Sequence, residues 1–447
     1  MVKFPTSATL YIVSACVVLA GAAAVLVYSF QLELGAVQYD ATSATASSGL
    51  ARATSTETEN EQPVDRVRHL ETPEAVRAVY MTTCAASTPS FRHHLVDLIE
   101  TTELNAIVID IKDYSGGISF PVNDPELKAA QGINCFVPDM KDFIASLHER
   151  DIYVIGRITV FQDPFYARRN PHIAVQTGAG AVWRDYKGLS FTDPGARKVW
   201  DYTVRLSRES YDIGFDELNY DYIRFPSDGN MKDIVFPVSG ERPKDVVVEE
   251  FFAYLHEQVN DPEVFPDSAP VTSADLFGMV TTNYDHLGIG QVLERALPYF
   301  DYIAPMVYPS HYPNGFNGWG NPNHYPYDVI RYTMSRGVAR AVATSTNVYF
   351  NGAERIGTST PAVYKKEAYD KDTMRPWLQD FDYGGDYGPE EVRGQIQATY
   401  DAGLDSWMLW DPGNRYTREA LKPASASPTP TIREEESSGR GSALRAN

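Results

Sequence analysis

Apolar stretches of strand length alternate with amphipathic stretches of helix length through residues 75–421. The strand-like stretches are rich in Val, Ile, Tyr and Phe, and the segments between them repeat apolar residues every three to four positions. Such alternation is typical of a parallel sheet, in which a crossover helix follows each strand. The pattern predicts strands at residues 78–83, 105–113, 153–161, 215–226, 271–279, 301–309, 375–381 and 406–412.

Helices are predicted between these strands, and three have a candidate start. Ser90 can cap a helix over residues 90–104, Asp139 can cap the next one, and Asp193 precedes Pro194 at a third start. The remaining helices are predicted at 244–260, 289–300, 326–342 and 389–402, with 343–373 as an insertion before the seventh strand.

Eight strands with crossover helices predict a closed (β/α)8 TIM barrel. An open, doubly wound sheet is the alternative, but the chain has no glycine-rich phosphate-binding motif to support it. The barrel is assigned to residues 73–422.

The N-terminal segment differs in composition from this region. Residues 8–30 carry no charged side chain and are long enough to cross a bilayer once as a signal anchor. Lys3 precedes them and acidic residues follow, so the positive-inside rule places residues 1–7 in the cytoplasm and the barrel outside. A cleaved signal peptide is the alternative, although its apolar region normally spans only ~7–15 residues. Under both readings the barrel is exported.

Two further segments have little apolar surface to bury. Residues 31–72 are rich in Ala, Ser, Thr and Glu and are predicted to be a flexible linker. Residues 423–447 are rich in Pro, Ser and charged side chains and are predicted to be a disordered tail.

The charge and composition of the chain limit the classes of molecule that it is expected to bind. The 39 basic and 59 acidic residues give a net charge of -20, which argues against nucleic acid. Aromatic residues make up 12%, which suits either sugar stacking or a large aromatic core.

Among three cysteines, Cys84 and Cys135 either pair or remain two buried thiols. The histidines lack metal-ligand spacing, so neither a metal nor a cofactor is expected. The expected partner is a polysaccharide or oligosaccharide, and the expected state is a monomer.

Polar residues share one alternating phase near the ends of four predicted strands. Strand two carries Asp110 and Lys112, strand three Arg157, strand four Asn219 and Asp221, and strand five Asp275. Alternate residues of a barrel strand face the interior, and active sites of this fold lie at the C-terminal ends of the strands. We therefore expect Asp110, Arg157, Asp221 and Asp275 to line one pocket.

The fourth-strand segment GFDELNYDYIRFP resembles the G-F-D-G-F-R-x-D motif of the alpha-amylase clan. In that alignment Asp221 occupies the position of the catalytic nucleophile, and Asn219 stands where the clan carries an arginine. More of the chain, including GRITVFQDP, GLSFTDP, SADLFG, DYIAPMVYPSHY and RPWLQDF, resembles the bacterial "putative glycosyl hydrolase domain" family. The resemblance implies a glycosidase-like barrel whose strand-four and strand-five carboxylates do the chemistry.

Glycosidic cleavage uses two carboxyl groups, one as acid and one as nucleophile or base. Asp221 is our candidate nucleophile or base and Asp275 our candidate acid, with Asp380 and Asp411 in reserve. Arg224 can keep Asp221 ionised if the side chains meet. The predicted substrate-binding residues are Asp110, Lys112, Arg157, Trp183, Asn219, Arg224, Tyr308, Gln379, Asp380, Trp410 and Asp411.

The sequence thus predicts a membrane-anchored, extracytoplasmic glycoside hydrolase acting on O-glycosidic bonds of an envelope or extracellular polysaccharide. A first alternative is a non-catalytic carbohydrate-binding barrel at the cell surface. A second is a lyase that uses Lys112 as a Schiff-base nucleophile, although a lysine flanked by carboxylates is more simply an ion pair.

Overall fold

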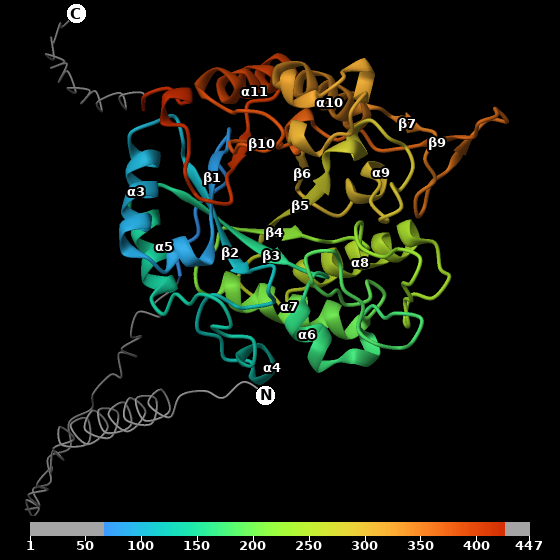
Figure 1. Cartoon of the computed structure of the whole chain (residues 1–447), viewed down its shortest axis with the longest axis horizontal. Helices are drawn as coiled ribbons and strands as arrows, with labels where there is room; N and C mark the ends of the chain where they lie inside the picture. Colours follow the sequence, from blue (N-terminus) through green and yellow to red (C-terminus); the bar gives the residue numbers. More distant parts are fainter. Residues whose placement is uncertain (1–66, 425–447) are drawn as a thin grey trace, which may run out of the picture. The chain divides into compact units, whose positions relative to one another are not determined.

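A computed structural model describes residues 67–424, which form a closed barrel of eight parallel strands. The strands neighbour one another in the order β1-β11-β10-β6-β5-β4-β3-β2 (Figure 1). Their bounds are β1 (Arg77–Met81), β2 (Ala106–Lys112), β3 (Tyr153–Thr159), β4 (Glu217–Asp221), β5 (Val271–Phe277), β6 (Tyr302–Met306), β10 (Trp377–Gln379) and β11 (Trp407–Trp410). All eight predicted strands are confirmed, and the barrel is closed rather than open.

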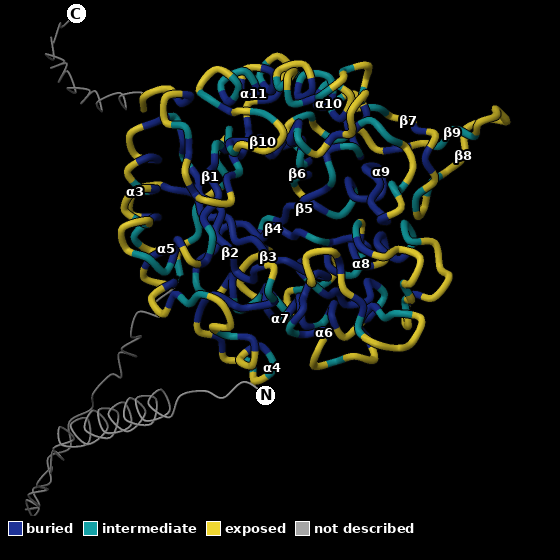
Figure 2. Tube along the Cα trace, viewed as in Figure 1, coloured by how far each residue is buried: buried dark blue, intermediate teal, exposed yellow. Residues whose placement is uncertain are grey.

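Helices cover the outside of the barrel. The longer ones are α3 (Pro89–Glu100), α5 (Met140–His148), α7 (Arg197–Tyr211), α8 (Lys244–Val259), α10 (Pro326–Val342) and α11 (Pro389–Asp401). Each buries one apolar side; α3, for example, buries Leu95, Leu98 and Ile99 as the periodicity predicted. Figure 2 shows the resulting pattern, with buried strands inside and exposed outer helix surfaces.

The predicted helix starts were less accurate than the strands. After β1 and the short helix α2 (Thr83–Ala86), α3 begins at Pro89 with Thr88 at its N-cap position, so Ser90 is no cap. Asp139 stands at the N-cap of α5 without a side-chain capping bond and pairs instead with Arg92, 2.7 Å away. Asp193 is buried and accepts backbone N–H bonds from Val238 and Ser239, and the helix that follows it begins only at Arg197. The helix predicted at 289–300 is reduced to the short α9 (Leu293–Ala296).

The insertion predicted at 343–373 lies between α10 and β10 and contains a small antiparallel sheet of its own. Its strands are β7 (Ser345–Thr346), β8 (Arg355–Ile356) and β9 (Val363–Lys365), in the order β7-β9-β8. The predicted barrel strand count is therefore unaffected by this segment.

A bulge in β2 changes the direction of one candidate side chain. Asp110 is paired with Arg157, but the next pairing is Lys112 with Ile158, so one extra β2 residue stands between them. Lys112 therefore points outward, with its Nζ atom 2.7 Å from Asp163 and 5.4 Å from the centre of the Tyr202 ring on α7. The prediction that Asp110 and Lys112 share one face is wrong.

Contacts with the barrel begin before the boundary predicted at residue 73. The Leu70 N–H donates to Asp216 at 2.7 Å, the Thr72 hydroxyl lies 3.0 Å from that of Tyr153, and His69 stacks on Tyr211 with ring centroids 4.0 Å apart. Residues 67–72 of the predicted linker therefore lie against the folded domain. The rest of the linker, the tail beyond residue 424 and the membrane span predicted at 8–30 fall outside the described residues.

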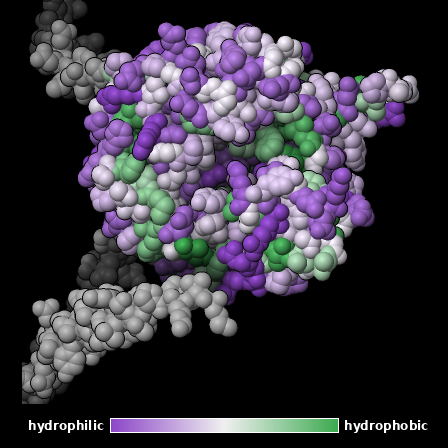
Figure 3. All heavy atoms as spheres, viewed as in Figure 1, coloured by the Kyte–Doolittle hydropathy of each residue, from purple (hydrophilic) through white to green (hydrophobic). Residues whose placement is uncertain are grey.

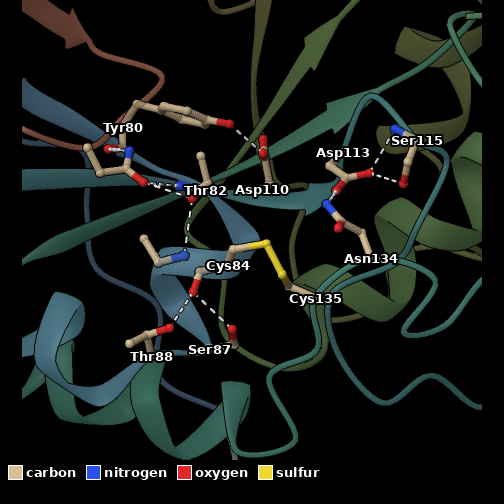
Figure 4. Close-up of a disulfide and its surroundings, with 12 residues drawn as sticks. Tyr80, Thr82, Cys84, Ser87, Thr88, Asp110, Asp113, Ser115, Asn134 and Cys135 are labelled. Atoms are coloured by element: carbon tan, nitrogen blue, oxygen red, sulfur yellow. Dashed lines mark hydrogen bonds between the residues drawn. A yellow bond between two sulfur atoms is a disulfide. The ribbon is translucent and has the colours of Figure 1, made fainter. Parts of the chain in front are cut away.

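One disulfide joins two segments that are distant in the sequence. Cys84, just after β1, forms a disulfide with Cys135 in the loop before α5 (Figure 4). Of the two alternatives left open by the sequence, pairing is the correct one. None of the helices between residues 67 and 424 is both long enough and apolar enough to cross a membrane.

Candidate active site

Four charged side chains meet inside the barrel at the C-terminal ends of β2, β3, β4 and β5. The Arg157 guanidinium donates from Nη1 to Asp110 at 2.7 Å and from Nη2 to Asp221, and its Nε lies 3.7 Å from Asp275. No more than 5% of the surface of any of the four is exposed. The four side chains meet around Arg157. Arg157, Asp221 and Asp275 line one cavity as predicted, whereas Asp110 does not, so the prediction is wrong for Asp110.

A cavity of about 620 Å³ opens above this cluster. Asp221, Asp275 and Arg157 form part of its lining, together with Tyr308 and Trp410. The remaining lining comes mainly from segments just after the strands, including Tyr222, Arg224, Phe277, Met279, His311, Phe381 and Tyr383. In the space-filling view the molecular surface is hollowed near the middle of the face shown, with hydrophilic side chains inside the hollow (Figure 3).

Asp275 lies in a setting that favours its protonated form. Its Oδ1 atom accepts hydrogen bonds from Asn219 Nδ2 at 2.9 Å and Trp377 Nε1 at 2.7 Å. Its Oδ2 atom accepts none from residues 67–424. Burial, followed by the charge of Asp221, raises the pKa of Asp275 to about 8. The proton is therefore expected on Oδ2, the oxygen without a donor.

Asp221 has different surroundings at the end of β4. One carboxylate oxygen pairs with Arg157, and the other accepts the N–H of Tyr222. Tyr222 has a φ of 52°, a left-handed conformation that is uncommon for a non-glycine residue and concentrates at functional sites. The site thus combines a carboxyl group paired with a guanidinium and a second one whose burial favours the protonated form, the arrangement that acid–base chemistry on one bond requires.

Asp110 stands behind Arg157 and is not part of the cavity lining. It accepts hydrogen bonds from Arg157 and from the Tyr80 hydroxyl at 2.5 Å (Figure 4), and burial raises its pKa to about 6. The Tyr80 ring stacks on Trp410, whose indole lies 5.0 Å from the Arg157 guanidinium. Asp110 and Tyr80 therefore fix the position of Arg157 rather than contact a ligand.

Arg224 lines the cavity but does not meet Asp221 as the sequence suggested. Its Nη1 atom donates to the Phe225 carbonyl at 3.0 Å and to the Ser227 hydroxyl at 3.2 Å. The cation that pairs with Asp221 comes instead from the neighbouring strand, as Arg157.

Six other predicted site residues lie outside the cavity lining: Lys112, Trp183, Asn219, Gln379, Asp380 and Asp411. Asn219 is fully buried and donates from Nδ2 to Asp275 at 2.9 Å. Lys112 points outward, as described above. Trp183 is 2% exposed and packs against Val175 and Phe191 within the long segment between β3 and α7. Gln379 is fully buried. Its Oε1 accepts the backbone N–H of Ser310 at 3.2 Å, and its Nε2 donates to the backbone carbonyl of Phe381 at 2.9 Å.

The two reserve carboxylates hold loops in place. Asp380 accepts hydrogen bonds from the N–H and hydroxyl of Thr417, and burial raises its pKa to about 6. Asp411 accepts the backbone N–H groups of Gly413 at 3.1 Å and Arg415 at 2.6 Å, which closes the turn after β11. Both line a second pocket, which shares Phe381, Tyr383 and Pro412 with the cavity.

The sequence reasoning missed Tyr222, Phe277, Met279, His311, Phe381 and Tyr383. Tyr222, Phe277, Met279 and Phe381 lie in the C-terminal parts of predicted strands, and His311 and Tyr383 each follow one by two residues, so the strand ends were the available signal. Burial lowers the pKa of His311, which favours a neutral imidazole at the cavity wall. Within residues 67–424 no group of three or more His, Cys, Asp or Glu side chains is placed to hold a metal ion.

We compared the chain with protein families, curated proteins and solved structures. Residues 78–416 match the model of a family described as "Putative glycosyl hydrolase domain". No curated protein matches the chain. A hypothetical protein from Ruminiclostridium thermocellum ATCC 27405 is 33% identical, over 44% of this chain and 96% of that one, with a TM-score of 0.39.

Two solved glycoside hydrolase domains are more distant in sequence. That of PgaB (BpsB) from Bordetella bronchiseptica is 14% identical, over 78% of this chain and 100% of that one, with a TM-score of 0.51. That of PelA from Pseudomonas aeruginosa is 10% identical, over 77% and 97% of the two chains, with a TM-score of 0.40. The likeness to the PgaB domain shows a shared fold.

Proposed function

The chain belongs to the family described as "Putative glycosyl hydrolase domain", and on that basis we propose that it hydrolyses O-glycosidic bonds with Asp221 and Asp275 as its carboxylate pair. Both residues line the same cavity, from adjacent strands, and both lie beside Arg157. One observation carries the proposal: the two carboxyl groups face one cavity, Asp221 paired with the Arg157 guanidinium and Asp275 bonded to the uncharged N–H donors of Asn219 and Trp377. Glycosidic cleavage needs such a pair.

In the proposed reaction Asp275 donates the proton on Oδ2 to the glycosidic oxygen as the bond to the anomeric carbon breaks. Asp221 either attacks the anomeric carbon or removes a proton from the water that does so. Hydrolysis adds the water hydroxyl to the anomeric carbon, and the water proton returns the carboxyl pair to its starting state. Arg157 holds the Asp221 carboxylate in place and keeps a positive charge beside the pair.

The walls of the cavity suit a sugar ring. Five aromatic side chains belong to its lining: Phe277, Tyr308, Phe381, Tyr383 and Trp410. Aromatic faces stack on the C–H groups of sugars, so these residues support an oligosaccharide or polysaccharide substrate over a small ester or peptide.

Asp221→Asn tests the proposal. The wild-type protein should release reducing sugar from at least one member of a panel of envelope and extracellular glycans, and Asp221→Asn should release none. Asp380→Asn and Asp411→Asn are matched controls, because both carboxylates serve loops outside the cavity. Activity that survives Asp221→Asn, or that is lost only with Asp380 or Asp411, contradicts the assignment.

The Cys84–Cys135 disulfide supports an extracytoplasmic site of action, because such bonds persist mainly in oxidising compartments. It agrees with export directed by residues 8–30, which we propose to be an uncleaved anchor. Membrane fractions of the native host should contain the protein with its N-terminus intact, and protease added outside should digest the barrel. A protein found in the cytoplasm with reduced Cys84 would contradict this location.

A further inference from the structure

Buried arginines in the described barrel are paired with carboxylates, with one exception. Arg157 pairs with Asp110 and Asp221, and Arg375 pairs with Glu217 at 2.9 Å. Arg295 pairs with Asp245 and Glu249, and Arg340 pairs with Glu294. Arg224 is 7% exposed, like Arg340, yet within residues 67–424 it forms no ion pair with any carboxylate.

The guanidinium of Arg224 is held in a fixed orientation at the cavity wall. Its centre lies 4.9 Å from the ring of Tyr222 and 4.7 Å from that of Phe277. Nη1 donates hydrogen bonds to the Phe225 carbonyl and the Ser227 hydroxyl. Nε and Nη2 donate to no atom in the described part of the chain. One edge of the guanidinium, with two parallel N–H groups, is therefore left for a ligand.

The other charged groups on this wall do not complete the pair. Asp185 accepts hydrogen bonds from the backbone N–H groups of Lys187 and Leu189 at 2.9 and 2.8 Å. These bonds stabilise the turn that follows Asp185. Asp228 also lines the cavity without bonding to Arg224, and Lys187 adds a second cation there. Burial lowers the pKa of Arg224, and the charges of Asp221, Asp228 and Asp185 offset this only in part, since none of the three carboxylates forms an ion pair with the guanidinium.

We propose that Arg224 binds the carboxylate of an acidic sugar, so that the substrate contains a uronic acid unit in the cavity beside Asp221 and Asp275. This inference rests on the proposed function and names its substrate class. A carboxylate matches the free guanidinium edge, because its two oxygens accept the two parallel N–H bonds. The net charge of -20 acts against an anionic polymer at long range, but salt screens exposed charges beyond ~8 Å, and contact with Arg224 is closer than that.

Binding of three matched monosaccharides tests this directly. D-glucuronate, its uncharged methyl ester and D-glucose would be titrated into the full-length protein and followed by ligand-observed NMR. A charged hydrogen-bonded pair is worth ~1.5–3 kcal/mol, so glucuronate should bind about tenfold or more tightly than the ester. Arg224→Gln should remove this preference, Arg224→Lys should keep part of it, and Arg336→Gln, an exposed arginine on α10, should leave it unchanged.

Several results would overturn the inference. Equal affinity for glucuronate and its ester would do so, as would a preference that survives in Arg224→Gln. Tighter binding of glucose 6-phosphate or glucose 6-sulfate than of glucuronate would assign Arg224 to a tetrahedral anion instead. Circular dichroism melting separates loss of binding from loss of fold, and Arg224→Lys keeps the test valid if Arg224→Gln does not fold.

The same experiments separate this inference from the proposed function. Hydrolysis of neutral glycans without any Arg224-dependent glucuronate binding would overturn the inference and leave the hydrolase intact. Arg224-dependent glucuronate binding by a protein that hydrolyses no glycan would support the inference and contradict the hydrolase.

Discussion

Asp221 and Asp275 have the same side chain, and their different surroundings set their different proposed roles. Asp221 is paired with the cation of Arg157, whereas Asp275 Oδ1 accepts two neutral N–H donors and its Oδ2 lies 3.7 Å from Arg157 Nε. Low dielectric and a nearby negative charge favour the neutral form of Asp275. An enzyme obtains an acid and a base from two aspartates by this kind of asymmetry.

The raised pKa of Asp275 predicts the alkaline limb of the pH profile. The acid must carry its proton to act, and the protonated form is present below its pKa of about 8 and lost above it. The value of kcat/KM should therefore fall as pH rises through about 8. On an activated aryl glycoside, which needs no acid, Asp275→Asn should lack this limb. A limb that persists in the variant would belong to another group.

Trp377→Phe moves the same limb in a defined direction. The indole N–H donates to Asp275 Oδ1 at 2.7 Å and favours the ionised carboxylate. Phenylalanine keeps an aromatic ring but has no donor, so the pKa of Asp275 should rise and the alkaline limb should shift to higher pH. A pH–rate profile of the variant checks the direction. A shift to lower pH would mean that the bond favours the acid.

At the scale of elements, the barrel strands could be predicted because each carries its own apolar pattern between turn residues. The bulge in β2 could not be predicted, because one extra residue after Asp110 leaves the preceding apolar run from Ala106 to Ile109 unchanged while turning Lys112 outward. The pairing of Arg157 was also hidden, since a long side chain can reach carboxylates on several strands. Asp380 and Asp411 looked like candidates because the loop N–H groups that use them cannot be located from sequence.

Lys112→Met tests the outward orientation of this residue. The change leaves Asp163 as an unpaired buried carboxylate and should lower the free energy of unfolding by about 3–5 kcal/mol. Lys112→Met combined with Asp163→Asn should recover part of that loss. Denaturant unfolding measures both. Borohydride trapping of a substrate adduct on Lys112 would support the Schiff-base lyase hypothesis and contradict the outward orientation of Lys112.

The disulfide joins Cys84 in the short helix α2 (Thr83–Ala86) to Cys135 in the loop before α5, with a sequence separation of 51 residues. The loop-entropy model assigns about 4 kcal/mol of stability to a cross-link of this span. A reducing agent should therefore lower the free energy of unfolding by an amount of that order. The double variant Cys84→Ser with Cys135→Ser should start lower and should not respond to the reductant. An equal response in both proteins would place the effect elsewhere.

At the scale of the whole molecule, the folded domain begins before residue 73. Leu70, Thr72 and His69 contact Asp216, Tyr153 and Tyr211 on the barrel. A chain of residues 67–424 should be about 1–3 kcal/mol more stable than one of 73–424, because removing the Leu70 N–H takes a hydrogen-bond donor from the buried Asp216 carboxylate. Thermal melting of the two chains compares them, and identical stability would show that residues 67–72 contribute nothing.

The central claim is that Asp221 and Asp275 cleave a glycosidic bond, with Asp275 as the acid. The most direct test measures kcat/KM of Asp221→Asn and Asp275→Asn on a natural oligosaccharide and on an aryl glycoside with a good leaving group. Asp221→Asn should lose activity on both. Asp275→Asn should lose roughly 10²–10⁴-fold on the oligosaccharide and keep much of its activity on the aryl glycoside, whose leaving group needs no proton. Equal losses on both substrates in both variants, or no loss in either, would contradict the assigned roles.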